Sequence, residues 1–153
     1  MSTNGAKRVL AISSGGGHWV QLLRLRPAFQ GCRVTYVTVN PVYRQDVPGE
    51  DFRLINDATR WDKVGLVRMA LKLLWIVLRV RPNVVISTGA APGYFAIRMG
   101  KLLGARTLWI DSIANVEQVS MTCTLVRQHA DLCLTQWAHL AGEPAPKFRG
   151  AVL

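Results

Sequence analysis

The sequence contains few acidic residues. Aspartate and glutamate together number 9, against 19 lysines and arginines, so the 153-residue chain carries a formal charge of +10. A small domain needs a net charge of only about 2–8 to stay soluble. The excess favours a polyanionic partner: nucleic acid, an anionic membrane or a phosphorylated ligand. Half of the residues are hydrophobic, which excludes a disordered chain and fits one domain with one core.

The sequence also lacks the residue spacings of common metal, redox and nucleotide sites. Cys32, Cys123 and Cys133 form no CxxC pair, and no GxGxxG or Walker A motif is present. We therefore expect no metal and no cofactor, and we expect the thiols to be buried and reduced. Residues 1–8 are polar and lack the apolar core of a signal peptide, so we expect a cytoplasmic protein.

Apolar, β-rich runs alternate with helical stretches along the chain. This alternation predicts an α/β fold with a Rossmann-like parallel sheet flanked by helices. The expected strands are 8–13, 34–39, 52–55, 84–87, 107–111 and 131–135, and the expected helices begin near residue 18 and cover 62–80, 93–103 and 120–128. Residues 1–141 form the expected domain. Residues 142–153, with Pro144, Pro146 and Gly150, form a C-terminal tail that extends away from the domain or frays.

A glycine-rich turn follows the first expected strand. Ligands bind beyond the carboxyl ends of the strands in open parallel sheets. Glycines let the backbone approach a ligand, and successive N–H groups before a helix N-terminus form a nest for an anion. The sequence therefore predicts a phosphate- or diphosphate-binding loop, although a tight turn without a ligand remains the alternative. The residues of this loop are Ser14, Gly15, Gly16, Gly17 and His18.

His18 at the end of this loop is a candidate catalytic residue. Its imidazole can accept a proton from an attacking hydroxyl, contact a ligand phosphate, or cap the helix.

Two further strand ends carry candidate site residues. The loop after residue 87 holds Thr88, Gly89 and Gly93, and its small side chains leave room beside the sheet for an anion; a plain turn is the alternative. Asp111 ends a later strand, where a carboxylate can orient a sugar hydroxyl, act as a base or cap a following helical turn, and Asn115 follows in the same loop.

The expected helix 62–80 is apolar apart from a stripe of cations. At about 100° per residue, Arg68, Lys72 and Arg79 fall on one side, with Trp75 among them. This pattern is typical of a helix that lies in a membrane interface, and Arg68 and Lys72 interrupt the apolar run that a spanning helix needs. The alternative is a crossover helix on the sheet with a basic solvent face.

Four stretches together resemble one family of proteins. They are SSGGGHWVQL at 13–22, ISTGAAPG at 86–93, DSIANVEQVSMTC at 111–123 and HADLCLTQWAHLA at 129–141, and the terminal RGAVL resembles the family's ending. The chain resembles the Alg14-type, or PssD-like, subunits of split glycosyltransferases. This resemblance implies the N-terminal, acceptor domain of a GT-B enzyme similar to MurG.

The resemblance also implies partners. A separate Alg13- or PssE-like subunit would bind the UDP-sugar, and this chain would bind a polyprenyl-diphosphate sugar acceptor at the cytoplasmic face of the membrane, for polysaccharide biosynthesis. The acceptor-loop roles would pass to the glycine loop and to Thr88, Gly89 and Gly93, and the acidic position to Asp111, where many relatives carry glutamate. The family's terminal segment contacts its partner, which makes Gly150, Ala151, Val152 and Leu153 the expected docking segment. No DxD metal motif is present.

Three other functions fit parts of the same sequence. A stand-alone phosphate- or nucleotide-binding enzyme would bind a UDP-sugar without a partner. A basic membrane adaptor would need no catalytic residues. A nucleic-acid-binding module would bind DNA or RNA in a salt-dependent way, but no motif of interleaved aromatic and basic residues supports it, and we expect no nucleic acid partner.

Overall fold

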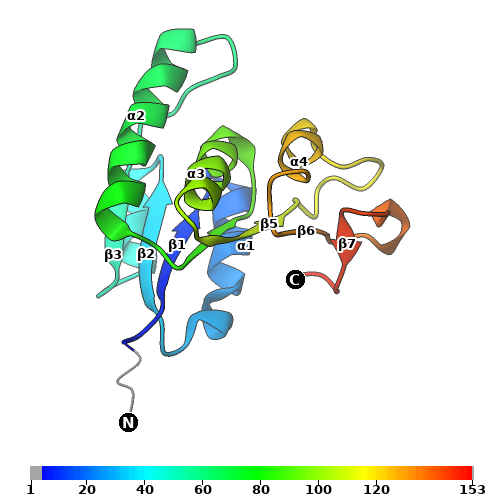
Figure 1. Cartoon of the computed structure of the whole chain (residues 1–153), viewed down its shortest axis with the longest axis horizontal. Coiled ribbons are helices and arrows are strands. Elements are labelled where there is room, and N and C mark those ends of the chain that lie inside the picture. The colour runs from blue at the N-terminus through cyan, green and yellow to red at the C-terminus, as the bar shows by residue number, and fades with distance from the viewer. Residues whose placement is uncertain (1–4, 153) are drawn as a thin grey trace.

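The computed structural model describes residues 5–152, which build one sheet of seven strands with helices on both faces (Figure 1). Every strand pairing is parallel, in the order β3-β2-β1-β4-β5-β6-β7. The strands are β1 (Arg8–Ile12), β2 (Arg33–Thr38), β3 (Asp51–Leu54), β4 (Val84–Ser87), β5 (Arg106–Ile110), β6 (Leu132–Thr135) and β7 (Lys147–Phe148). The helices are α1 (Gly17–Arg24), α2 (Lys63–Val80), α3 (Ala90–Leu102) and α4 (Met121–Val126), with 3-10 helices η1 (Arg26–Phe29), η2 (Pro41–Asp46) and η3 (Ala138–Leu140). The predicted Rossmann-like fold is confirmed.

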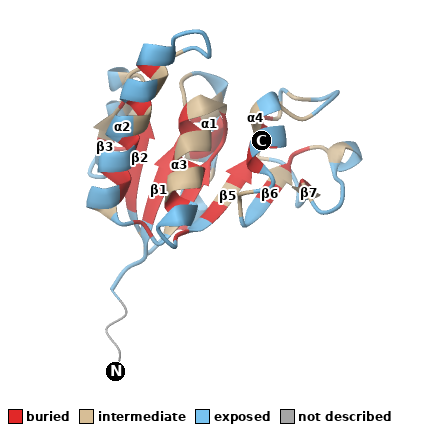
Figure 2. Ribbon diagram, turned by 45° about the horizontal axis from the view of Figure 1, so that its top comes forward, coloured by how far each residue is buried: buried red, intermediate tan, exposed pale blue. Residues whose placement is uncertain are grey.

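The sheet has a separate hydrophobic core on each face. Leu10 and Ile12 of β1 pack under the layer formed by α2, α3 and α4, whereas Val9 and Ala11 pack under α1 and η1. The central strands are consequently buried on both sides, as Figure 2 shows in red. Helices on both faces exclude water from a parallel sheet, which explains why its strands are apolar at successive positions.

Apart from the 3-10 helices, which were not predicted, two elements differ from the sequence prediction. Helix α3 begins at Ala90, three residues before the predicted start at Gly93. Pro92 fits in the first turn of α3. The N–H groups of a first turn make no hydrogen bond within the helix, so the missing N–H of proline removes none. Strand β7 was not predicted at all, since it has only two residues and follows two prolines.

The C-terminal segment returns to the sheet. Strand β7 pairs in parallel with β6, so that Leu134 is opposite Lys147 and Thr135 is opposite Phe148. The expected tail therefore contributes an edge strand to the domain and does not extend away from it. Leu153, the last residue of the expected docking segment, lies outside the described residues.

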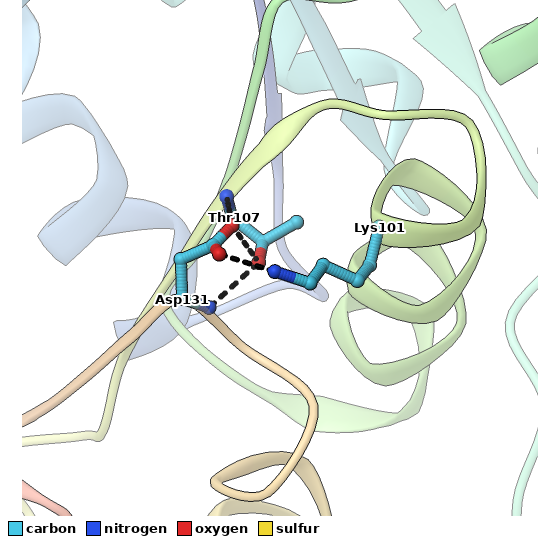
Figure 3. A network of polar contacts seen from close by, with 3 residues as sticks. All are labelled: Lys101, Thr107 and Asp131. Atoms are coloured by element: carbon cyan, nitrogen blue, oxygen red, sulfur yellow. Dashed lines mark hydrogen bonds and ion pairs between the residues drawn. The ribbon is translucent and has the colours of Figure 1, made fainter.

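A polar cluster joins the beginnings of β5 and β6 at the edge of the sheet opposite to the glycine loop (Figure 3). The Asp131 carboxylate is paired with the Lys101 ammonium group and accepts hydrogen bonds from the backbone N–H of Thr107 (2.9 Å) and from its hydroxyl (3.1 Å). The hydrogen bond from Lys101 lowers the pKa of Asp131 most, and those from Thr107 act in the same direction against partial burial. Asp131 therefore stabilises the fold in its ionised form.

Replacing Asp131 with asparagine is expected to lower the free energy of unfolding by about 1–2 kcal/mol at neutral pH. Because the folded state lowers the pKa, this stabilisation is present above the unfolded value of about 4 and is lost as the pH falls through the folded value. Urea unfolding of both proteins across the acid range measures the effect, with Glu117→Gln as an exposed control. A difference that persists undiminished at the acid end would contradict this role.

The cysteines meet the expectation of buried thiols at two of the three positions. Cys123 and Cys133 are buried, free and 3.4 Å apart at their Sγ atoms, whereas Cys32 is half-buried. The hydrogen bond with Cys133, together with burial, raises the pKa of Cys123 far above its ordinary value. Cys123 therefore remains protonated, and both buried side chains pack as apolar groups.

Candidate functional site at the carboxyl edge of the sheet

The strand order reverses its direction between β1 and β4. The chain builds outward from β1 through β2 and β3, then returns to β4 and continues through β5, β6 and β7 on the other side. Helix α1 leaves β1 toward one face of the sheet, and α3 leaves β4 toward the other. Such a switch point opens a crevice beyond the strand ends, where ligands bind in open α/β sheets. The predicted glycine loop and the loop after residue 87 flank this point.

Reciprocal hydrogen bonds join these two loops. The Nδ1 atom of His18 lies 3.0 Å from the carbonyl oxygen of Thr88, and the Thr88 hydroxyl donates to the carbonyl oxygen of His18 at 2.6 Å. A carbonyl oxygen can only accept, so Nδ1 carries the proton in this contact. In the neutral imidazole, Nε2 is then the unprotonated nitrogen, which is the form that a general base requires.

Backbone strain is concentrated at the same junction. Gly16, the N-cap of α1, has φ 67°, and Gly89, the N-cap of α3, has φ 146°. Ala90 has φ 67°, a left-handed conformation that is uncommon for a residue with a side chain. Strained backbone of this kind gathers at functional sites because the surrounding fold must hold it in place.

Part of the glycine loop has free hydrogen-bond donors. The N–H of Gly16 donates to the Tyr43 hydroxyl at 2.9 Å, so one amide is used within the protein. Within the part of the chain that the structure describes, the amides of Gly15, Gly17 and His18 have no hydrogen-bond acceptor. Helix α1 has no acidic residue in its first turn, so its positive N-terminal end is uncompensated. This arrangement suits a bound anion.

Gly93 is placed differently from its prediction. It lies inside α3 and is buried, so it does not belong to the loop that faces the crevice. A methyl group on Gly93 would overlap Ser87 Oγ, and it would lie 2.8 Å from Ser87 Cβ and 3.0 Å from Trp109. The close packing of α3 on the sheet explains why this position is a glycine.

Replacing Gly93 with alanine is consequently expected to destabilise the fold. Overpacking of this kind costs about 1–3 kcal/mol. Thermal unfolding measures the loss, and Gly17→Ala is the matched control, because a methyl group there meets open space at a helical position and should leave stability unchanged or slightly higher. Unchanged stability of the Gly93→Ala protein would contradict the packing role.

Asp111 is buried at the end of β5 and is surrounded by donors. Its carboxylate accepts hydrogen bonds from the Ser120 N–H (2.8 Å) and hydroxyl (2.6 Å), from the Asn115 side chain (3.1 Å) and from the Trp109 indole (3.4 Å). Asn115 thereby serves the same cluster. The carboxylate fixes the loop 112–120 against the sheet, and this geometry favours a positioning role over that of a proton acceptor.

Two buried glutamines connect the strand-end loops, and the sequence analysis did not single them out. Gln21 of α1 donates to the Ser112 hydroxyl at 3.2 Å and accepts from the N–H of Ile113 at 3.2 Å. Gln136, which follows β6, donates to Gln21 and to the carbonyl oxygen of Asp111, and it accepts from the N–H of Val152 at 2.7 Å. The network holds α1, the loop after β5 and the C-terminal segment together. The only signal in the sequence was a glutamine on the apolar side of α1.

Helix α2 has two apolar faces. One is buried on the sheet through Gly65, Met69, Leu73, Ile76 and Val77. The other is exposed and spans an arc of about 100°; its members, which we call the outer stripe, are Val64, Val67, Leu71, Leu74, Trp75 and Leu78. Beside the outer stripe, Arg68, Lys72 and Arg79 are also exposed, as the sequence pattern predicted.

Figure 1 shows that the beginning of α2 projects beyond the carboxyl edge of the sheet. Among the described residues, no helix has the length and apolarity that crossing a membrane requires.

Comparison with known proteins defines the fold. No protein-family model and no curated protein matches the chain. Solved structures do match: MurG from Acinetobacter baumannii, with 15% identity and a TM-score of 0.74 over 95% of this chain, and UDP-N-acetylglucosamine 2-epimerase from Rickettsia bellii, with 12% identity and 0.72 over 96%. A glycosyltransferase from Rickettsia africae matches at 11% identity and 0.61 over 86%. The chain spans 45% of the length of the first two proteins and 37% of the third. The fold is that of one domain of the GT-B type.

Proposed function

We propose that the chain is the acceptor-binding, membrane-associated subunit of a UDP-sugar-dependent glycosyltransferase that extends a polyprenyl-diphosphate-linked oligosaccharide for polysaccharide biosynthesis. The observation that carries the proposal is the junction of two glycine-bearing turns at the switch point, with free amides at the N-terminus of α1. Free N–H groups at a helix N-terminus match a diphosphate in both charge and hydrogen bonding.

In the proposed reaction, the acceptor diphosphate lies on the amides of Gly15, Gly17 and His18. His18, held by Thr88 through Nδ1, accepts the proton of the attacking sugar hydroxyl at Nε2. The new glycosidic bond forms at the donor's anomeric carbon as the bond to UDP breaks, and negative charge develops on the leaving diphosphate. The partner subunit stabilises that charge, because in this proposal the UDP-sugar binds to the domain that the partner supplies.

Helix α2 indicates which side of the protein would face the membrane. A helix with a wide exposed apolar stripe flanked by cations is suited to lie in the interface of an anionic membrane. Because α2 projects past the edge that carries the glycine loop, a diphosphate linked to a lipid in that membrane can reach the loop. The protein would then lie on the cytoplasmic face as a peripheral subunit.

An Alg13- or PssE-like partner completes the enzyme in this proposal. Two of the similar proteins are about twice as long as this chain, and GT-B enzymes form their cleft between two domains. The segment 149–152 is close to the site, since Val152 contacts Gln136 and its carbonyl oxygen accepts from Arg24 at 3.2 Å. A partner docked on residues 150–152 would therefore face the crevice.

Reconstitution tests the proposal. The chain and a small PssE-like protein from a neighbouring reading frame are purified, and transfer from a panel of UDP-sugars to a polyprenyl-diphosphate sugar is measured with each chain alone and with both. Transfer is expected only with both chains. Robust transfer by this chain alone, or equilibrium binding of a UDP-sugar to it, would instead favour the stand-alone nucleotide-sugar enzyme that the similarity to the epimerase leaves as the second candidate.

A further inference from the structure

A cleft separates the edge strand β3 from α2, outside the site described above. Its volume is about 320 Å³, within the range of pockets that hold small molecules. Trp75 and Ile76 provide apolar walls, and Arg44, Arg53 and Lys72 provide the charge. Apolar and positively charged side chains therefore line the same cleft.

The positive charge of this cleft is largely uncompensated. Arg53 is paired with Asp51 at 3.1 Å, but both side chains are well exposed, and exposed pairs of this kind are weak. The Arg44 guanidinium lies 5.9 Å from the ring centroid of Phe52. In residues 5–152, neither Arg44 nor Lys72 has an ion-pair partner. Three cations and one carboxylate therefore leave a net attraction for an anion.

The position of the cleft indicates what kind of anion it suits. Trp75 belongs both to the cleft and to the outer stripe, so the cleft opens directly onto the exposed apolar surface of α2. A free phosphate ion would use only the cations. A phosphate that carries acyl chains would use the cations and would also cover the apolar surface beside them.

We infer that this cleft binds the phosphate head group of an anionic membrane phospholipid, whose acyl chains lie along Leu71, Trp75 and Leu78. The inference rests on the proposed contact of α2 with the membrane and adds a site that selects a head group. Arg44 and Lys72 make charge-assisted hydrogen bonds to the phosphate, and Arg53 is released from its exposed pair to add a third.

Nuclear magnetic resonance of the ¹⁵N-labelled chain tests the site. The probe is a short-chain phosphatidylglycerol below its micelle concentration. The Trp75 indole and the backbone amides of Phe52 and Arg53 are expected to shift, and the shifts are expected to vanish in Arg44→Gln/Lys72→Gln. The matched control, Arg68→Gln/Arg79→Gln, removes the same charge from the same surface outside this cleft and should retain them. Equal shifts with inorganic phosphate would overturn the assignment to a lipid.

Vesicle binding tests the consequence. Vesicles of equal negative charge are prepared with phosphatidylglycerol or with oleate, which has no phosphate. The native chain and the Arg68→Gln/Arg79→Gln control are expected to prefer phosphatidylglycerol by about tenfold, and Arg44→Gln/Lys72→Gln to show no preference. Equal binding of the native chain to both vesicles, or probe-induced shifts centred on the glycine loop, would refute the head-group site and leave membrane contact by α2 intact. Loss of binding to every vesicle would instead count against the proposed membrane role as well.

Discussion

Replacing Gly89 with alanine is expected to reduce transfer by the reconstituted enzyme at least about a hundredfold, the loss that a displacement of roughly 1 Å at a catalytic group can cause. Gly89 has φ 146° with extended ψ, a conformation that is nearly restricted to glycine. A methyl group there would also overlap the His18 imidazole, lying 2.5 Å from Cε1. The chain can relieve the overlap only by moving His18 or the loop after β4. Either movement breaks the contacts between His18 and Thr88 that orient Nε2.

Gly104→Ala separates this effect from backbone strain. Gly104 has φ 85°, and a methyl group there meets open space after the end of α3, far from the crevice. Both substitutions should lower stability by about 1–3 kcal/mol, but only Gly89→Ala should impair transfer. A partner-free measurement accompanies the assay: the amide shifts that farnesyl diphosphate produces at Gly17 and His18 should weaken in Gly89→Ala and persist in Gly104→Ala. Equal activity of the two proteins would show that the junction of the loops is not the site.

The positions of the strand ends could be predicted because their signals are local. Runs such as RVLAIS and VVIS are apolar and β-branched, and the small residues that follow each run mark its end. Since parallel strands place all their carboxyl ends on one edge, the neighbourhood of His18 and Thr88 followed from the strand assignment. Their reciprocal hydrogen bonds did not follow, because they depend on the order β1-β4 within the sheet, which residues 70 positions apart cannot reveal.

The roles of residues that depend on tertiary packing could not be predicted from the sequence. Asp111 has the same sequence context as an exposed strand-end carboxylate, and only the folding of the loop 112–120 brings Ser120 and Asn115 to it. Gly93 similarly looked like a loop glycine, whereas its neighbours Ser87 and Trp109 come from two different strands. Strand β7 has too few residues for any periodicity, and its pairing partner β6 decides its conformation.

Helix α2 shows what the hydrophobic pattern of a sequence cannot decide. Its residues are apolar nearly all the way round, which fits both a helix buried in a core and a helix in a membrane interface. Packing on the sheet covers Met69, Leu73 and Ile76, and it leaves Leu71 exposed by 64% and Trp75 by 56%. The fold therefore buries one apolar face and leaves the other largely exposed among the described residues, which motivates the last prediction.

Replacing Val67 and Leu71 together with glutamine is expected to lower the partition coefficient of the chain onto anionic vesicles about a hundredfold. Burying an aliphatic side chain in an apolar phase contributes about 1.5–3 kcal/mol, and two partly inserted side chains contribute about 3 kcal/mol together. Neither residue lines the cleft between β3 and α2, so the change leaves the cations of the cleft in place and removes apolar surface of the outer stripe. Cosedimentation with vesicles over a range of lipid concentrations gives the partition coefficient, and added salt should weaken the residual, electrostatic part of the binding.

The control has the same chemistry on another helix. Met121→Gln/Leu125→Gln also removes two exposed apolar side chains, from α4, which lies in the same layer as α2 but is separated from it by α3, and should bind vesicles like the native chain. Both double substitutions should leave the free energy of unfolding within about 0.5 kcal/mol, because the altered side chains contact water in the isolated domain. Leu73→Ala should do the reverse: it removes a fully buried side chain of α2, so about 2–5 kcal/mol of stability is lost while the outer stripe remains. If the α2 substitutions destabilised the domain and left vesicle binding unchanged, the outer stripe would be part of a protein interface, and the membrane would have to be reached through another surface.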